Sequence, residues 1–181
     1  MLITIIFLTI TVILFIFSSK TLSPIPYFPS QRVDLPKIIK ALNLRNGQTV
    51  FDLGAGDGIV IFGAAKLSYQ QKLNTRFVAV EINPVLILIL HLRRLFHPNK
   101  KNIKIIYGDI FSINYTKLLT FNSSLFIFYL YISPWFLEKT VLNIKKQINK
   151  FNIVSYMYPV KSLSKAAVIK GKNKIFIYNI K

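Results

Sequence analysis

The 181-residue sequence contains no cysteine, only two histidines and only six acidic residues. The absence of cysteine excludes disulfide bonds, thiolate metal sites and cysteine nucleophiles. His91 and His97 lie in or just after one predicted helix, where histidines are more often surface or packing residues than ligands, so we predict no metal site. Hydrophobic residues make up 52% of the chain, which is ample for a packed core.

The scarcity of acids leaves a net charge of +18. Basic surfaces bind nucleic acids by releasing counterions from phosphates. The lysines are scattered along the chain rather than gathered in a stripe, and Ile, Asn, Phe and Tyr are abundant as well. We therefore interpret the charge as a general compositional bias and predict no specific nucleic-acid partner. Nucleic acid and an anionic membrane surface are the alternatives.

Residues 1–19, "MLITIIFLTITVILFIFSS", carry no charged side chain. A helix of that length spans roughly 28 Å, close to one hydrocarbon core. A cleaved signal peptide is less favoured, because no basic region precedes the apolar stretch and bulky Ile16 or Phe17 would stand where cleavage needs a small residue. Basic residues follow the stretch, so the positive-inside rule predicts a single-pass membrane anchor with the remaining chain in the cytoplasm.

The chain beyond the anchor divides into a connector and one domain. Residues 20–33 hold three prolines within six residues and predict a stiff, extended connector, and residues 34–181 form the predicted domain. Apolar runs predict strands over 49–53, 76–82, 103–109, 124–131 and 152–158, followed by a hairpin over 166–180. Helices are predicted from Asp34 as N-cap, from the glycines to about Leu67, from Asn83 to near Phe96, and from Pro134 onward.

This alternation predicts an α/β fold. Continuous apolar strands separated by helices form a parallel sheet that is covered on both faces, with ligands at the carboxyl ends of the strands. The closing hairpin predicts an antiparallel edge.

A glycine-rich loop, "GAGDG" over 54–58, follows the first predicted strand. A dinucleotide-binding loop would show G-x-G-x-x-G, and Asp57 would oppose a pyrophosphate at the helix N-terminus. A phosphate-binding loop is excluded because no G-K-[ST] follows. A zwitterionic or cationic ligand would tolerate Asp57. Four of the six acids, Asp52, Asp57, Glu81 and Asp109, lie in this loop or at strand ends, which indicates that chemistry requires their positions.

The segments "VFDLGAGDG", "VAVEINP" and "IIYGDI" resemble, in order and spacing over residues 48–158, the class I S-adenosylmethionine-dependent methyltransferases. The resemblance implies a Rossmann-like seven-stranded methyltransferase sheet and S-adenosyl-L-methionine as cofactor. It implies that the loop wraps the methionine part, that Glu81 holds the ribose hydroxyls and that Asp109 lies near the adenine amine. The implied cofactor-binding residues are Asp52, Gly54, Ala55, Gly56, Asp57, Gly58, Glu81, Ile82, Asn83, Asp109 and Ile110.

A closer resemblance includes the apolar amino terminus, "PYFPS" and "FYLYISP". These segments are similar to small membrane-associated lysine methyltransferases related to the ATP synthase c-subunit lysine methyltransferase. Phe28 and Ser30 depart from that pattern, where a branched aliphatic residue and usually Thr are expected. The resemblance leaves the substrate open. The anchor, together with the aromatic residues of the fourth strand, predicts a protein substrate with a lysine near the membrane.

The end of the fourth predicted strand, "YLYISPW", supplies aromatic side chains where the methyl acceptor usually lies. Tyr129, Tyr131 and Trp135 lie there, with Tyr27 and Phe28 able to reach over from the connector. We predict Tyr129, Trp135 and Tyr27 as the acceptor-side lining, although each could be a plain core or cap residue. Ile132 cannot accept a hydrogen bond, which disfavours a nucleic-acid base. A lysine amine fits better, because burial in an apolar site lowers its pKa and ring faces stabilise the methylated cation. The alternatives are methylation of a quinone or lipid, and a membrane-tethered binding module without catalysis.

Overall fold

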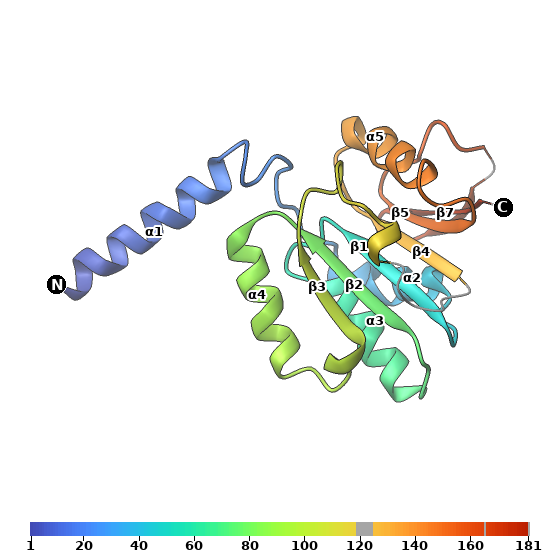
Figure 1. Ribbon diagram of the computed structural model, residues 1–181, viewed down its shortest axis with the longest axis horizontal. Coiled ribbons are helices and arrows are strands. Elements are labelled where there is room, and N and C mark those ends of the chain that lie inside the picture. The colour runs from blue at the N-terminus through green and yellow to red at the C-terminus, as the bar shows by residue number, and fades with distance from the viewer. Residues whose placement is uncertain (119–124, 165, 181) are drawn as a thin grey trace.

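The computed structural model describes residues 1–118, 125–164 and 166–180, and its centre is one sheet (Figure 1). The strands are β1 (Gln48–Leu53), β2 (Arg76–Glu81), β3 (Ile103–Tyr107), β4 (Leu125–Leu130), β5 (Phe151–Tyr156), β6 (Ala167–Lys170) and β7 (Lys174–Ile180). The α-helices are α1 (Leu2–Ser18), α2 (Leu35–Leu42), α3 (Ile59–Gln70), α4 (Pro84–Leu95) and α5 (Pro134–Lys145). Three short 3-10 helices are η1 (Arg32–Asp34), η2 (Lys100–Asn102) and η3 (Thr116–Leu118).

The sheet has seven strands in the order β3-β2-β1-β4-β5-β7-β6. The strands β1 to β5 pair in parallel, and β7 pairs antiparallel with both β5 and β6. The predicted mostly parallel sheet with a closing antiparallel hairpin is confirmed. The strand order reverses between β1 and β4, and such a switch point opens a crevice at the carboxyl ends of the strands.

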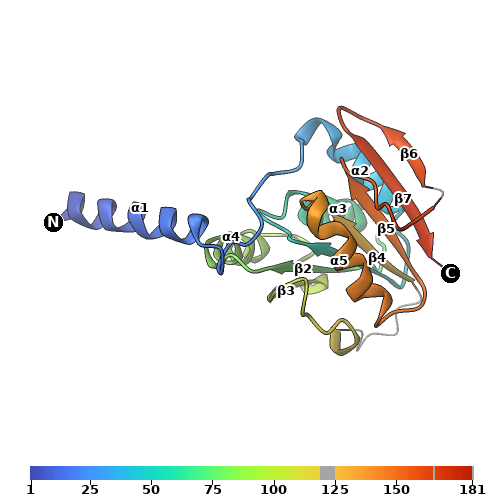
Figure 2. The same cartoon turned by 90° about the horizontal axis from the view of Figure 1, so that it is seen from above.

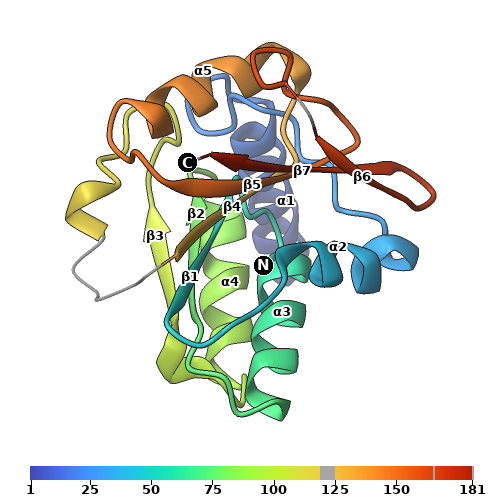
Figure 3. The ribbon, with the colours of Figure 1, turned by 90° about the vertical axis from the view of Figure 1, so that its right-hand side faces the viewer.

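Helices cover both faces of the sheet, as the view in Figure 3 shows. On one face, α2, α3 and α4 bury residues such as Leu42, Ile61 and Leu90 against alternate strand residues. On the other face, α5 buries Leu137 and its neighbours along the helix. Because every second strand residue points to the same face, the continuous apolar strands supply both cores.

Some element ends differ from the predictions. The fifth strand ends at Tyr156 rather than at 158, because Met157 adopts a positive φ of 72° that turns the chain. The third strand ends at Tyr107, so Asp109 lies in the following loop. Residue 124, at the start of the fourth predicted strand, lies outside the described residues, and β4 begins at Leu125.

The Asp34 side chain does not cap α2 as predicted. It is buried and accepts hydrogen bonds from the backbone N–H groups of Lys172 (2.7 Å) and Asn173 (2.9 Å) and from the Tyr156 hydroxyl (2.8 Å). Burial alone would raise the pKa of this carboxyl, but the hydrogen bonds outweigh burial and hold its pKa below the ordinary value. The closing turn thus offers Asp34 more donors than the helix does, and the carboxylate joins the start of the domain to its last hairpin.

The amino-terminal helix α1 has 17 residues, buries none of them and projects away from the sheet (Figures 1 and 2). In the described part of the chain, no helix combines the length and the apolar character needed to cross a membrane. The membrane-spanning segment predicted over residues 1–19 is therefore not supported. The helix stops at Ser18, because the chain is extended at Ser19.

Replacing Asp34 by Asn is expected to lower the free energy of unfolding by about 2 kcal/mol, because an amide accepts hydrogen bonds from three donors less well than a carboxylate. The loss should shrink as the pH falls below the ordinary carboxyl pKa, where the wild-type residue becomes protonated as well. Urea denaturation measures the difference. Glu138→Gln, at a half-buried acid that also accepts backbone N–H groups, is the control and should change stability by less than about 0.5 kcal/mol. An equal effect of both substitutions would show that the Asp34 carboxylate does not hold the closing hairpin to the start of the domain.

Candidate functional site

A pocket lies at the carboxyl ends of β1, β2 and β4. Its walls come from the connector, the glycine loop and the turns that follow β2, β3 and β4. They comprise residues 23–30, Asp52, Gly54, Ala55, Gly56, Asp57, Ile59, Val60, Glu81, Ile82, Leu86, Gly108, Asp109, Ile110, Phe111, Tyr129, Tyr131 and Ile132. The crevice expected at the switch point therefore contains most of the predicted site residues.

The glycine loop turns sharply beneath this pocket. Gly54, Gly56 and Gly58 all have positive φ angles, of 75°, 58° and 76°, which side chains with a Cβ rarely adopt. The N–H groups of Gly54 and Ala55 donate to the Val80 carbonyl on β2 at 2.9 and 3.0 Å. The loop is thereby held against the neighbouring strand with its backbone facing the pocket.

The Glu81 carboxylate, at the end of β2, accepts three backbone hydrogen bonds. Gly56 N–H donates to Oε2 at 2.8 Å, and the N–H groups of Ile82 and Asn83 donate to Oε1 at 2.8 and 2.9 Å. A carboxylate has about four acceptor positions, so one remains in this arrangement. Glu81 can accept one further hydroxyl here. Binding both ribose hydroxyls, as predicted, requires it to release a backbone N–H.

Asp52, the last polar residue of β1, is 3% exposed and has two other acids nearby. Burial, followed by the negative charges of Glu81 and Asp57, raises its pKa from 3.8 to about 8, while a hydrogen bond from the Ile61 backbone in the first turn of α3 lowers it. A carboxyl in this position ionises readily when a positive charge approaches. The pocket therefore favours a cationic ligand over an anionic one.

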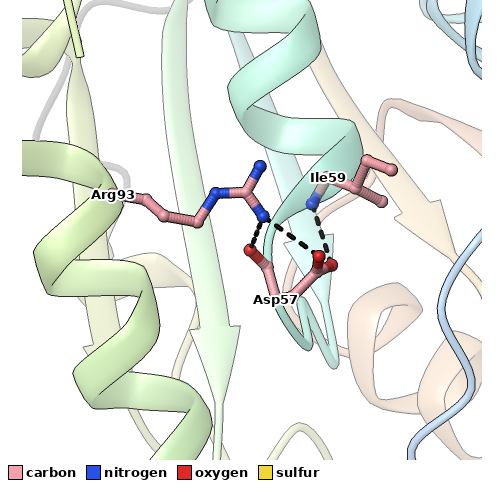
Figure 4. Close-up of polar contacts among 3 residues, drawn as sticks. All are labelled: Asp57, Ile59 and Arg93. Carbon is pink, nitrogen blue, oxygen red and sulfur yellow. Dashed lines mark hydrogen bonds and ion pairs between the residues drawn. The ribbon is translucent and has the colours of Figure 1, made fainter. Parts of the chain in front are cut away.

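Asp57 is paired with Arg93 of α4 (Figure 4). Arg93 Nη1 lies 3.0 Å from Asp57 Oδ2 and also donates to the Asp57 carbonyl, while Asp57 Oδ1 accepts from Ile59 N–H at 3.2 Å. The guanidinium also stacks over the Phe62 ring at 5.1 Å. Sequence reasoning missed Arg93, since no motif marks it. Arg93 partly neutralises the charge of Asp57. From the sequence, a pyrophosphate is excluded because Asp57 would repel it, and this ion pair weakens that repulsion.

The remaining predicted cofactor residues divide into two groups. Ile82, Asp109 and Ile110 line the pocket, and Asp109 Oδ1 accepts from Phe111 N–H at 2.9 Å. Gly58 and Asn83 do not line it. Asn83 caps α4 by accepting from the N–H groups of Val85 (2.9 Å) and Leu86 (3.3 Å). These two residues shape the starts of α3 and α4 rather than the pocket wall.

The connector forms one wall of the pocket. The Tyr27 ring lies so close to the glycine loop that a Cβ on Gly56 would be 2.7 Å from Tyr27 Cε2. The hydroxyls of Ser30 and Tyr129, both buried, are hydrogen-bonded at 2.8 Å. Tyr27 therefore lies at the glycine loop rather than at the acceptor end where it was predicted. Tyr129 is in the pocket wall, and its hydroxyl fastens the connector.

A second pocket adjoins the first and shares Ile25, Pro26, Phe28, Tyr131 and Ile132 with it; Ser133, Met157 and Tyr158 complete its lining. No carboxyl or amide side chain is among these residues of the described chain. The Tyr131 ring packs edge-on against Tyr156, with centroids 4.9 Å apart. Tyr131, which directly follows β4, thus lines this pocket, whereas Trp135 does not.

Trp135 lies outside both pockets and is 81% exposed. Helix α5 buries Leu137, Val141 and Ile144 against the sheet, and Trp135 is two residues before Leu137. Two helical residues correspond to a rotation of about 200°, so Trp135 is directed toward solvent. The prediction that Trp135 lines the acceptor side is wrong.

Comparisons with known proteins identify the fold. A scan against models of known protein families found no match, and a search of curated proteins found none either. Among solved structures, the chain is similar to an RNA methyltransferase from Salinibacter ruber in complex with S-adenosyl-L-homocysteine, with a TM-score of 0.70 and 17% identity over 84% of this chain and 94% of that one. The chain has the fold of the S-adenosylmethionine-dependent methyltransferases.

Two further structures share this fold. A precorrin-6y C5,15-methyltransferase from Geobacter metallireducens has a TM-score of 0.58 and 16% identity, over 86% of this chain and 93% of that one. An rRNA methyltransferase from Streptomyces viridochromogenes has a TM-score of 0.59 and 12% identity, over 84% and 86% of the two chains. These neighbours are named for different methyl acceptors, so the shared fold does not identify the acceptor of this chain.

Replacing Asp52 by Asn is expected to stabilise the ligand-free protein above about pH 8, by roughly 2 to 5 kcal/mol. The raised pKa means that folding disfavours the ionised carboxylate, so the wild type loses stability as the pH rises from 3.8 to about 8. The advantage of the variant should grow over that range and then stay constant. Urea denaturation at several pH values measures it. A difference that does not depend on pH would show that Asp52 ionises normally.

Proposed function

We propose that the protein is an S-adenosylmethionine-dependent methyltransferase. The observation that carries this proposal is the gathering of Asp52, Glu81 and Asp109 around a glycine loop, in one pocket of a methyltransferase fold. Four of the six acids, Asp52, Asp57, Glu81 and Asp109, line this pocket, which favours a cationic cofactor although the chain as a whole carries +18.

The residues of this pocket fit that cofactor. When bound, S-adenosylmethionine supplies a methyl group made electrophilic by a sulfonium. Asp52 would be ionised by the approaching cation and would stabilise it. Glu81 has one acceptor position for a ribose hydroxyl, and Asp109 would accept from the adenine amine. Tyr27, packed on Gly56, would close the connector side.

We propose a lysine amine of a protein as the methyl acceptor. The described lining of the second pocket offers ring and aliphatic surfaces and hydroxyl groups, but no carboxyl or amide side chain. An ammonium that enters such a site loses hydration, which lowers its pKa and favours the unprotonated nucleophile. The rings can then stabilise the methylated cation. The hydrogen-bonding edge of a nucleic-acid base would find few partners there, which disfavours the acceptors that two of the structural neighbours are named for.

We further propose that the enzyme acts at a membrane surface. Every residue of α1 except Ile16 and Phe17 is exposed, and the helix carries no charged side chain. A helix that is apolar on all sides is stable when buried in an apolar medium. We infer that α1 enters a bilayer from one side. The basic residues that follow it favour the anionic cytoplasmic leaflet, so a membrane-protein lysine would be close to the pocket.

Replacing Glu81 by Ala should weaken binding of S-adenosylhomocysteine by about 1.5 to 3 kcal/mol, because the ribose contact and the loop support are both lost. Calorimetric titration measures the affinity. Glu81→Gln retains the shape but not the charge and should lie between Ala and wild type. Glu138→Gln, at an acid that does not line the pocket, is the control and should bind normally. Wild-type affinity in Glu81→Ala would remove the cofactor assignment.

Label transferred from methyl-labelled S-adenosylmethionine to host membranes should survive nuclease and organic extraction and should be released by protease as methylated lysine. Tyr131→Ala should slow the transfer at least about tenfold with little change in cofactor affinity, because it opens the acceptor pocket. Trp135→Ala, at an exposed aromatic outside the pocket, is the matched control and should transfer normally. Label that enters the organic phase would instead identify a quinone or lipid, and nuclease-sensitive label would identify a nucleic acid.

A further inference from the structure

Helix α4 exposes large apolar side chains on the side that faces away from the sheet. Leu88, Leu92, Leu95 and Phe96 are 60%, 53%, 57% and 84% exposed, whereas Leu86 and Leu90 of the same helix are buried. The four exposed residues follow the spacing i, i+4, i+7, i+8 and so share one face. We call these four residues the α4 stripe. A surface helix of a globular domain normally presents polar residues there, so the stripe indicates an apolar partner.

Helix α4, which carries the stripe, lies next to the apolar amino-terminal helix. The helices α1 and α4 contact each other, and Figures 1 and 2 both show α4 beside the end of α1 that joins the domain. An apolar partner that receives α1 would therefore also reach α4. A bilayer is such a partner, because it is wide enough to cover both helices at once.

The charges around the stripe are complementary to an anionic lipid surface. Residues 84–101 contain no acid, whereas Arg93 and Arg94 end α4 and Lys100 and Lys101 follow in η2. Helices that lie in the membrane interface combine an apolar face with such a basic border, which contacts the phosphates of the lipid headgroups. Arg93 is also paired with Asp57, so the net positive border comes chiefly from the other three residues.

We propose that the α4 stripe is a second membrane-contact surface, which lies flat on an anionic bilayer beside the insertion point of α1. This inference rests on the proposed action at a membrane. A single inserted helix would leave the protein free to rotate about the axis of α1, whereas two contacts fix its orientation on the membrane. Because Leu86 of α4 lines the candidate pocket, the same contacts hold the pocket close to the lipid surface.

The test places a tryptophan in the stripe of the full-length chain. Trp135→Phe removes the single native tryptophan, and Leu92→Trp then reports on the stripe. On vesicles of phosphatidylcholine and phosphatidylglycerol, its emission should shift to the blue, become shielded from aqueous iodide and be quenched by brominated acyl chains. Leu95→Trp repeats the measurement one turn away. A probe that stays equally accessible to iodide with and without vesicles would overturn the proposal.

Two matched variants locate the contact. Leu142→Trp, at a leucine of α5 that is 53% exposed, should not be quenched by brominated lipid, and equal quenching there would overturn the proposal. Phe7→Trp reports on α1 alone. Quenching of Phe7→Trp without Leu92→Trp would reject the stripe but keep the membrane proposal, whereas quenching of neither would reject both. Shielding of Leu92→Trp in buffer before vesicles are added would indicate a second copy of the chain on the stripe and would also overturn it.

Discussion

The geometry of the pocket depends on the carboxylate of Glu81. By accepting the N–H groups of Gly56, Ile82 and Asn83, it joins the loop after β1 to the turn after β2. Helices α3 and α4 begin directly after these two segments, so their starts are set by the same contact. Charge-assisted hydrogen bonds in a buried place are strong and directional, and here they replace the side-chain packing that a loop of glycines lacks.

The electrostatics of the pocket contrast with those of the rest of the chain. Asp52, Asp57 and Glu81 lie close together, and Arg93 compensates only Asp57 directly. The proximity of these acids destabilises the ionised form of Asp52, whose pKa is raised to about 8 by burial and by its acidic neighbours. Perturbed acids of this kind are typical of functional sites, because the unfavourable charge is relieved when the ligand arrives.

Local patterns were enough to predict the sheet and the position of the pocket, because apolar periodicity and glycine spacing act over a few residues. Contacts between distant segments were not predictable in this way. Asp34 was expected to cap its own helix, yet its partners lie more than 120 residues away in the closing hairpin and β5. The side on which Trp135 lies follows from the apolar face of α5, and the spacing of Leu137, Val141 and Ile144 carried that signal, although the prediction for Trp135 did not use it. The contact of Tyr27 with Gly56 depends on the path of an irregular connector, which leaves no periodic signal.

The connector limits where the domain can be joined to a different membrane anchor. Residues 23–30 are a stalk that leads to α1 and also a wall of the pocket, fastened by the hydroxyls of Ser30 and Tyr129. A stalk of this kind cannot be exchanged for a flexible linker of equal length. Any transplant of the domain onto another anchor has to place its junction before Ser23, so the smallest portable unit is longer than the domain that the sheet and its helices define.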